Sequence, residues 1–135
     1  MNFSETQIRV RYGETDQMGI VYHANYAQYF EIGRTEWLRQ LDITYSSMEK
    51  NGIMLPVVSL EINYRNSARY DDLLKVKTML KRRPTSSIKF DYELYNEANI
   101  LLTTGSTVLA FIDTKNNKPT RCPEYLLNKL QNYSL

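Results

Sequence analysis

The sequence predicts an α+β domain in which one long helix packs against one antiparallel sheet. A single amphipathic helical pattern of about four turns begins near residue 25. One strand-like segment precedes this helix, and about four alternating segments follow it. The later segments are joined by short turns, which connect neighbouring strands in antiparallel order. We therefore expect residues 1–135 to form a single domain in which a curved sheet wraps the helix.

The first predicted strand covers residues 6–12, TQIRVRY. Apolar and polar side chains alternate along it, so Ile8, Val10 and Tyr12 share the face that is predicted to be buried. The residues that follow, GETDQMG, are turn formers and end the strand. The chain is therefore expected to reach the helix through a polar loop.

The predicted helix carries an apolar stripe whose members stand three or four positions apart. The stripe consists of Tyr26, Phe30, Gly33, Trp37 and Leu41. His23 and Asn25 both stand at its start, and asparagine is the better N-cap type. Gly33 lies in the stripe although a glycine costs a helix up to about 1 kcal/mol relative to alanine. We therefore expect a strand to pack very close to this part of the helix.

The rest of the chain is dominated by strands. A short helix is predicted within residues 42–52, with a serine as its N-cap and Gly52 as its stop. Strands are then predicted at residues 56–64, 73–80, 88–95 and 100–113. The last of these is the longest and most apolar, which indicates a central strand with a bend at Gly105. Residues 114–119 are predicted to form a hairpin-like turn or a tail, and residues 123–133 a short terminal helix with proline at its first position.

Composition excludes several classes of function. The formal net charge of +2 is too small to predict a nucleic-acid surface. No stretch approaches the ~20 apolar residues that a membrane-spanning helix requires. The single cysteine, Cys122, cannot form an internal disulfide, which together with the absence of a signal peptide predicts a cytoplasmic protein. Cys122 is expected to be a spectator thiol. One histidine and one cysteine cannot form a zinc site without several carboxylates, so no metal is expected.

The surface of the predicted sheet needs protection, because one helix leaves its edges and outer face uncovered. The chain contains 11 tyrosines, and tyrosine suits both half-buried strands and interfaces. The long apolar strand and these tyrosines together predict that another subunit covers part of the surface. A symmetric dimer is the commonest arrangement of this kind.

The loop before the helix holds residues with possible catalytic chemistry. Free N–H groups at a helix start stabilise an anion, including one that develops during a reaction. Asp16, placed opposite them, would act as a base or a nucleophile, and these parts suffice for acyl transfer. Gly19 allows a sharp turn and lets a ligand approach the main chain.

A structural role explains the same residues. An aspartate in such a loop commonly forms an Asx turn or a cap, and a lone histidine near a helix start commonly packs or hydrogen-bonds. Ser4, Ser46 and Ser47 have no nucleophile-elbow pattern around them, so a Ser-His-Asp triad is not predicted. From the residues alone, both interpretations of Asp16 and His23 remain open.

The segment RYGETDQMGIVYHANYAQYFEIGRTEWL resembles the acyl-CoA thioesterases of the hotdog fold. More narrowly, it is similar to the 4-hydroxybenzoyl-CoA thioesterase family and its bacterial YbgC-like branch. The matching residues are Tyr12, TD at 15–16, GIV at 19–21, YH at 22–23, NY at 25–26, and FE at 30–31 with Arg34 after it. A second segment, YRNSARYDDLLKV, also resembles the family, although Ser67 stands where proline is usual. This departure affects loop stiffness rather than chemistry, and the order of elements fits nearly the whole chain.

The resemblance implies a hotdog fold, with five to six antiparallel strands wrapped around one long central helix. It implies a homodimer that pairs its sheets edge to edge, often as half of a homotetramer, with the active site at the dimer interface. It assigns the essential carboxylate to Asp16, as nucleophile or as general base on water. The backbone N–H of His23 polarises the thioester carbonyl in this scheme, Gly19 lets the acyl group approach, and Tyr22 belongs to the same catalytic group.

The implied reaction is hydrolysis of acyl-CoA thioesters to a free carboxylic acid and coenzyme A. Coenzyme A is part of the substrate and product, so no separate cofactor is expected. The candidates for binding its phosphates through charge-assisted hydrogen bonds are Arg82, Arg83, Ser86 and Ser87. A solvated, positively charged hairpin explains the same four residues equally well.

Three other functions stay open. A thioesterase for acyl carrier protein would use the same chemistry on another carrier. A hotdog dehydratase or hydratase typically pairs a catalytic histidine with a carboxylate in another pattern, whereas this chain has only His23. A protein that binds acyl-CoA without hydrolysing it would gain nothing from the negative charge of Asp16. The acyl group itself is not predicted.

Overall fold

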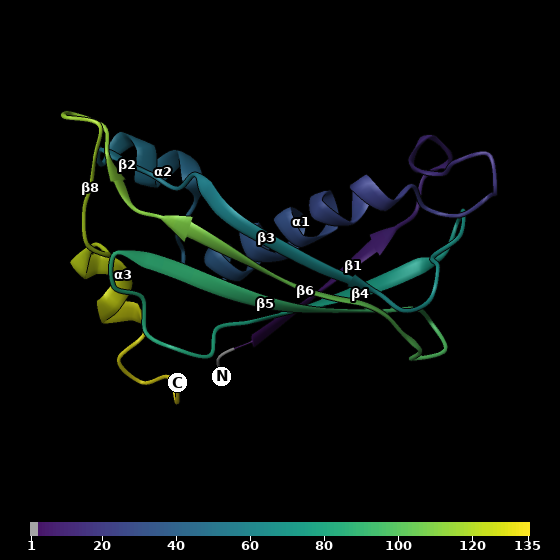
Figure 1. Cartoon of the computed structure of the whole chain (residues 1–135). Coiled ribbons are helices and arrows are strands. Elements are labelled where there is room, and N and C mark those ends of the chain that lie inside the picture. The colour runs from purple at the N-terminus through teal and green to yellow at the C-terminus, as the bar shows by residue number, and fades with distance from the viewer. Residues whose placement is uncertain (1–2) are drawn as a thin grey trace.

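The computed structural model describes residues 3–135 and consists of a five-stranded antiparallel sheet with one long helix along one face (Figure 1). The strands lie in the order β1-β4-β5-β6-β3. They are β1 (Phe3–Arg9), β3 (Val57–Tyr64), β4 (Leu73–Met79), β5 (Ser87–Tyr95) and β6 (Leu101–Ala110), and the helix is α1 (Tyr26–Arg39). The sheet curves around the helix, as the resemblance implies, and the observed number of strands in it is five.

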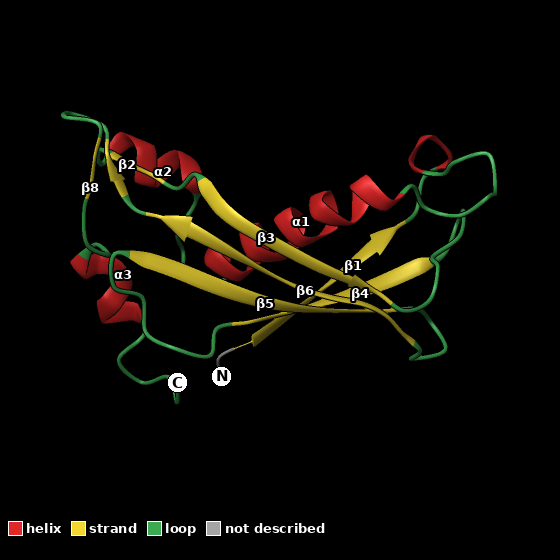
Figure 2. Cartoon of the chain, in the orientation of Figure 1, coloured by secondary structure: helices red, strands yellow, loops and turns green. Residues whose placement is uncertain are grey.

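Smaller elements gather at the end of the sheet that lies on the left in Figure 2. These are α2 (Tyr45–Lys50), α3 (Glu124–Lys129) and a three-stranded sheet of β2 (Ile53–Met54), β7 (Ile112–Asp113) and β8 (Lys118–Pro119). The loop that contains Asp16 lies at the opposite end of the sheet. The pairing of β7 with β8 confirms the predicted hairpin. Between residues 3 and 135, no helix is long and apolar enough to cross a membrane.

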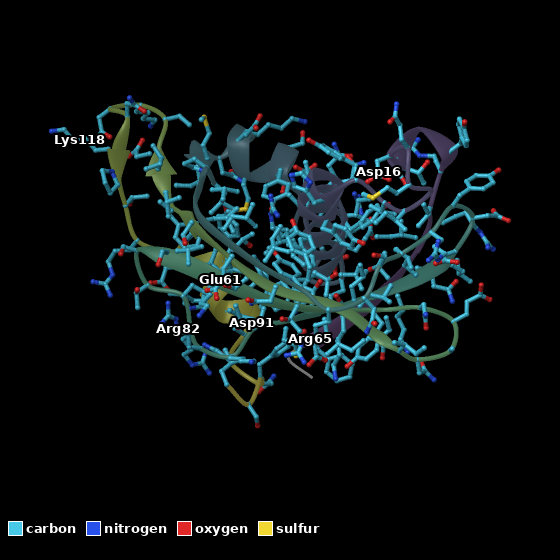
Figure 3. All side chains as sticks on the ribbon, turned by 45° about the vertical axis from the view of Figure 1, so that its right-hand side comes forward. Asp16, Glu61, Arg65, Arg82, Asp91 and Lys118 are labelled. Carbon is cyan, nitrogen blue, oxygen red and sulfur yellow. The ribbon has the colours of Figure 1, made fainter. Side chains whose placement is uncertain are left out.

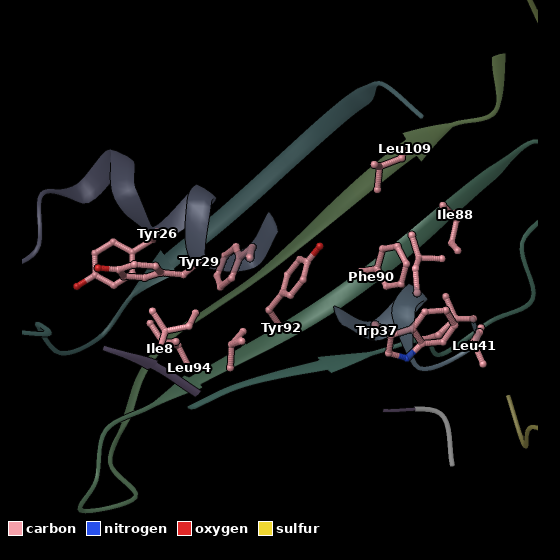
Figure 4. Packing of buried hydrophobic residues seen from close by; sticks show 14 of the residues in the cluster. Ile8, Tyr26, Tyr29, Trp37, Leu41, Ile88, Phe90, Tyr92, Leu94 and Leu109 are labelled. Carbon is pink, nitrogen blue, oxygen red and sulfur yellow. The ribbon is translucent and has the colours of Figure 1, made fainter. Parts of the chain in front are cut away.

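The apolar stripe of α1 faces the sheet and is buried, as predicted; its last predicted member, Leu41, is also buried but lies just beyond the end of the helix. Figure 4 shows how its aromatic residues meet those of β5. Phe30 stacks on Tyr92 with ring centroids 4.4 Å apart, and Trp37 meets Phe90 edge to face at 5.2 Å. Aromatic pairs in these arrangements add to the free energy gained by burying their area. The helix is therefore fixed on the sheet by its packing rather than by its helix propensity.

Gly33 lies at the closest approach between α1 and the sheet. A Cβ atom built on Gly33 would overlap the Thr78 hydroxyl and come within 3.2 Å of a methyl group of Val76, both on β4. The expectation that a strand packs very close to this glycine is confirmed. Any larger residue would push the helix away from β4, because protein cores are close-packed.

Gly105 also makes room for α1, and it does not mark an irregularity in β6. A Cβ at Gly105 would come within 2.5 Å of the Phe30 ring. The register runs through Gly105 without a shift on either side, and the shift between β5 and β6 lies at Leu94 and Tyr95 instead. β6 pairs with β5 on one side and with β3 on the other, so the prediction that it is a central strand rather than an edge strand is confirmed.

Several element boundaries differ from the sequence prediction. The strand predicted at residues 100–113 is divided into β6, which ends at Ala110, and β7. β1 ends at Arg9, and Tyr12 is 78% exposed in a 3₁₀ turn, because the loop leaves the sheet earlier than the alternation suggests. The N-cap of α2 is Thr44, whose hydroxyl accepts the Ser47 N–H at 3.0 Å, rather than a serine. Pro123 directly precedes α3, with an extended backbone, rather than being its first residue.

The two edge strands of the sheet differ in character. β1 presents mainly polar residues, which suit an edge that faces water. β3 is apolar and almost entirely exposed, with Val58 61%, Leu60 47% and Tyr64 52% exposed. An exposed apolar edge strand is a ready template for pairing with another chain.

Candidate active site

The loop between β1 and α1 forms a small hairpin around Asp16. The Asp16 N–H donates to the Ile20 carbonyl at 2.8 Å, and the Gly19 N–H donates to the Asp16 carbonyl at 3.0 Å. Gly19 has a φ of +78°, a conformation in which a side chain is strained. A Cβ at this position would meet nothing within 4 Å, so the space beside Gly19 is open. Both properties expected of this glycine, a tight turn and open access, are present.

The Asp16 carboxylate combines a structural contact with a free oxygen. Its Oδ1 atom accepts the Met18 N–H at 2.8 Å, which is the Asx turn that the structural interpretation expects. Within residues 3–135, no hydrogen bond reaches Oδ2. The turn therefore fixes the orientation of the carboxylate and leaves one oxygen available for chemistry.

Glu14 holds this loop against the start of α1. Its carbonyl oxygen accepts the Tyr22 N–H at 2.9 Å and the Asn25 side-chain N–H at 2.8 Å. Its carboxylate accepts the buried Tyr29 hydroxyl at 3.0 Å. Asn25 occupies the N-cap position of α1, as predicted, but its side chain makes no cap hydrogen bond, because it is turned to Glu14. Asn25 therefore fixes the position of the helix start rather than capping it.

The helix start presents two free donors. A 3₁₀ turn, η2 (His23–Asn25), leads directly into α1. In the described part of the chain, the backbone N–H groups of His23 and Ala24 have no acceptor. Free N–H groups at a helix start carry partial positive charge and stabilise a nearby anion. Donors of this kind are what an oxyanion site requires.

A cavity of about 270 Å³ lies between the carboxylate and the helix start. Asp16, Met18, Ile20, Val21, His23 and Tyr26 line it from the loop and α1, and Tyr64, Arg65, Asn66 and Ser67 from the end of β3 and the loop after it. Figure 3 shows Asp16 at this end of the molecule. The structure thus brings Asp16 and His23 to one cavity.

A second cavity, of about 650 Å³, also adjoins the Asp16 loop. Gly19 and Asp16 line it together with Tyr12 and Tyr70, whose rings meet edge to face at 5.7 Å. Tyr22 lines neither cavity; its ring packs on the His23 ring at 4.4 Å. Tyr22 therefore contributes its backbone groups to the turn rather than its side chain to a cavity.

Two tyrosines of the first cavity were not predicted as residues of the site. Tyr26 is buried, and its oxygen accepts the Ala68 N–H at 3.2 Å; burial raises its pKa, so the phenol stays neutral. Tyr64 is half exposed, and its hydroxyl donates to the His23 carbonyl at 2.9 Å. The family-like segment that begins at Tyr64 was the available signal in the sequence, but it does not indicate this contact.

The four candidates for phosphate binding lie far from Asp16 in the chain's own fold. Arg82, Arg83 and Ser86 are exposed in the turn between β4 and β5, and Ser87 is the first residue of β5. Figure 3 shows Arg82 and Asp16 at opposite ends of the sheet. A single chain therefore does not bring these residues to the carboxylate.

Other catalytic chemistries find little support in the described residues. Cys122 is buried, and burial raises the pKa of its thiol to about 12, so it is protonated at neutral pH. Within residues 3–135, no group of three or more His, Cys, Asp or Glu side chains is placed to hold a metal ion. The carboxylate and the helix start remain the strongest constellation of reactive groups.

Comparison with known proteins gives consistent matches over most of the chain. Residues 10–130 match the family model described as the thioesterase-like superfamily. YneP of Bacillus subtilis is 39% identical over 119 residues, covering 88% of this chain and 86% of that protein. The acyl-CoA thioesterase YbgC of Haemophilus influenzae is 35% identical over 118 residues, covering 87% and 86%. The structure of a DHNA-CoA thioesterase from Staphylococcus aureus has a TM-score of 0.88 and 41% identity, covering 95% and 86%.

Proposed function

This chain belongs to the thioesterase-like superfamily, and from that premise we propose that it hydrolyses acyl-CoA thioesters to a free carboxylic acid and coenzyme A. The observation that carries the proposal is the cavity lined by both Asp16 and His23, whose backbone N–H is free at the helix start. Thioester hydrolysis requires a base or nucleophile on one side of the carbonyl carbon and an oxyanion donor on the other. Both parts meet at this cavity.

In the general-base route, Asp16 Oδ2 takes a proton from water as that water attacks the thioester carbonyl carbon. The carbonyl oxygen becomes an oxyanion, which the His23 N–H stabilises. When the tetrahedral intermediate collapses, the carbon–sulfur bond breaks and the thiolate of coenzyme A takes the proton from Asp16. The products are a carboxylic acid and a free thiol.

In the nucleophilic route, Asp16 Oδ2 itself attacks the carbonyl carbon and displaces the thiolate. Water then hydrolyses the resulting mixed anhydride and regenerates the carboxylate. The Asx turn supports either route. Oδ1 accepts the Met18 N–H, which fixes the orientation of the carboxylate and therefore the direction of its free oxygen, Oδ2. The same oxyanion donor serves both routes.

A second copy of the chain completes the site in this proposal. β3 is an apolar edge strand, and pairing two such edges antiparallel places the Tyr64 end of one beside the Val57 end of the other. The partner's turn between β4 and β5 then lies three strand spacings away, or about 14 Å. Its counterparts of Arg82 and Arg83 are thereby placed to receive the phosphates of a coenzyme A whose thioester lies at Asp16.

The test measures thiol release from short aliphatic, long aliphatic and aromatic acyl-CoAs with the wild type and Asp16→Asn. We expect hydrolysis to fall by roughly 10²- to 10⁴-fold in the variant, the usual range for a lost acid–base group. Binding of a non-hydrolysable thioether analogue, measured by calorimetry, should persist. The matched control is Asp91→Asn on the outer face of β5 (Figure 3), which should retain full activity.

The outcomes separate the alternatives. A wild type that binds the analogue but releases no thiol from any acyl-CoA is a binding protein, and the enzyme proposal fails. Full activity in Asp16→Asn removes the role of Asp16 while leaving the reaction intact. If the kcat/KM for an acyl group on acyl carrier protein is higher than for the same group on coenzyme A, acyl carrier protein is the carrier instead.

A further inference from the structure

We propose that Tyr64 is a positioning residue for the oxyanion site, acting through the peptide group that joins His23 to Ala24. The inference rests on the proposed function and adds a residue from the edge strand to that site. Tyr64 is the last residue of β3, 41 positions from His23 in the sequence. Its hydroxyl donates to the His23 carbonyl at 2.9 Å, and its ring lines the cavity that Asp16 shares.

The contact acts on a specific peptide group. The His23 carbonyl belongs to the same peptide unit as the Ala24 N–H, and that N–H has no acceptor among the described residues. A hydrogen bond accepted by a carbonyl polarises its peptide unit and strengthens the N–H as a donor. The Tyr64 hydroxyl therefore makes the Ala24 N–H a better donor to an anion in front of the helix.

The preceding peptide unit is arranged in the same way, but through the backbone. The carbonyl of Tyr22, which shares a peptide unit with the His23 N–H, accepts the Asn25 N–H at 2.9 Å. The first two free donors of the helix start thus each belong to a peptide unit whose carbonyl is already hydrogen-bonded. The His23 carbonyl also accepts the Tyr26 N–H within the 3₁₀ turn, and the Tyr64 hydroxyl adds a second hydrogen bond to it from a side chain. The effect of Tyr64 can therefore be removed without altering the main chain.

The position of the Tyr64 ring is itself well defined. It meets the Tyr26 ring edge to face at 5.3 Å, and Tyr26 is buried and hydrogen-bonded to the Ala68 backbone. The Tyr64 ring therefore packs on a buried neighbour, and this packing keeps its hydroxyl at the His23 carbonyl. Because Tyr64 is 52% exposed, its hydroxyl contributes little to folding. A role in positioning explains the contact better than a role in stability.

The experiment compares Tyr64→Phe with Tyr95→Phe. Both substitutions remove one hydroxyl and keep the ring, and Tyr95 donates to Glu93 at 3.0 Å on the outer face of the sheet. We expect Tyr64→Phe to lower kcat by roughly 3- to 10-fold, with KM and the melting temperature unchanged. Tyr95→Phe should leave kcat unchanged. An unchanged kcat in Tyr64→Phe, or an equal loss in both variants, would overturn the inference.

A second measurement is independent of turnover. The backbone amide proton of Ala24, observed by NMR, should move upfield in Tyr64→Phe, because its peptide unit loses polarisation. The same proton should keep its position in Tyr95→Phe. If the wild type hydrolyses no thioester, the proposed function fails, and this shift still decides whether Tyr64 acts on the helix start. An Ala24 proton that does not move in Tyr64→Phe would contradict that action.

Discussion

The buried Tyr29 hydroxyl donates a hydrogen bond of 3.0 Å to the Glu14 carboxylate. This bond joins the first turn of α1 to the loop that carries Asp16. The same carboxylate accepts the Arg11 N–H at 2.9 Å. Burial, and then the charge of Glu14, raise the pKa of Tyr29 above its ordinary value of 10.0. The active-site loop is therefore held by a phenol that resists ionisation.

This contact predicts a loss of stability in alkali. Tyr29 keeps its proton in the folded chain above pH 10, whereas it ionises in the unfolded chain, so the free energy of unfolding should fall as the pH rises above 10. Tyr29→Phe should cost about 1 kcal/mol at pH 7, and its further loss above pH 10 should be shallower than that of the wild type. Urea unfolding across this pH range measures both effects. A Tyr95→Phe variant that loses as much at pH 7 would contradict the special role of the buried pair.

The approach of Gly33 to β4 predicts an effect opposite to helix propensity. Alanine favours a helix over glycine by about 1 kcal/mol, yet its Cβ would overlap the Thr78 hydroxyl. Gly33→Ala should therefore destabilise the protein by about 1–3 kcal/mol, the usual range for overpacking. Gly13→Ala is the matched control, because a Cβ there meets nothing within 4 Å. Thermal unfolding of both variants provides the comparison, and a stabilised Gly33→Ala would show that the helix moves freely on the sheet.

The exposed edge of β3 predicts that a charge placed on this strand prevents two chains from pairing. Val58→Lys places a charge on a side chain that is 61% exposed in the isolated chain but would be covered when two edges pair. We expect this variant to run at half the wild-type mass in light scattering and to lose most of its hydrolytic activity. Ile100→Lys changes a residue of similar exposure, 48%, in the loop before β6 and should alter neither property. A wild type that is monomeric and fully active would refute the shared site.

The turn between β4 and β5 predicts a change in substrate binding alone. Arg82→Ala and Arg83→Ala remove cations that would meet the phosphates of coenzyme A, so KM should rise several-fold while kcat stays the same. The increase should shrink at high salt, because exposed charges are screened. Arg39→Ala, at the end of α1, removes an exposed cation elsewhere and should leave KM unchanged. If all three variants keep the KM of the wild type, the turn does not bind coenzyme A.

The sequence predicted the elements whose burial follows a local period. β4 and β5 alternate buried and half-buried residues along their whole length, and α1 buries every residue of its predicted stripe. Leu41, the last residue of the predicted stripe, is also buried but lies beyond the end of α1. These patterns depend only on neighbours within one element, so they can be found in one sequence. The C-terminal end of β1 could not be found in this way, because Tyr12 continues the alternation of apolar and polar residues after the strand has ended.

Contacts between distant segments explain what the sequence did not predict. Arg34 is buried in α1 because its guanidinium donates to the Tyr45 hydroxyl at 3.1 Å, a partner from another helix. Tyr64 reaches His23 only because β3 returns to the helix start after the chain has formed α1 and α2. No spacing within either segment encodes such a meeting. The loop residues Asp16 and Gly19 could be identified because the chemistry of their types is local.

The unpaired apolar edge of β3 makes catalysis in this proposal a matter of mass action. If each site needs residues of two chains, the number of working sites depends on the equilibrium between single and paired chains. Activity per chain would then rise with protein concentration and reach a plateau only above the dissociation constant. A cell could thus set the output of this protein through its abundance more steeply than in direct proportion.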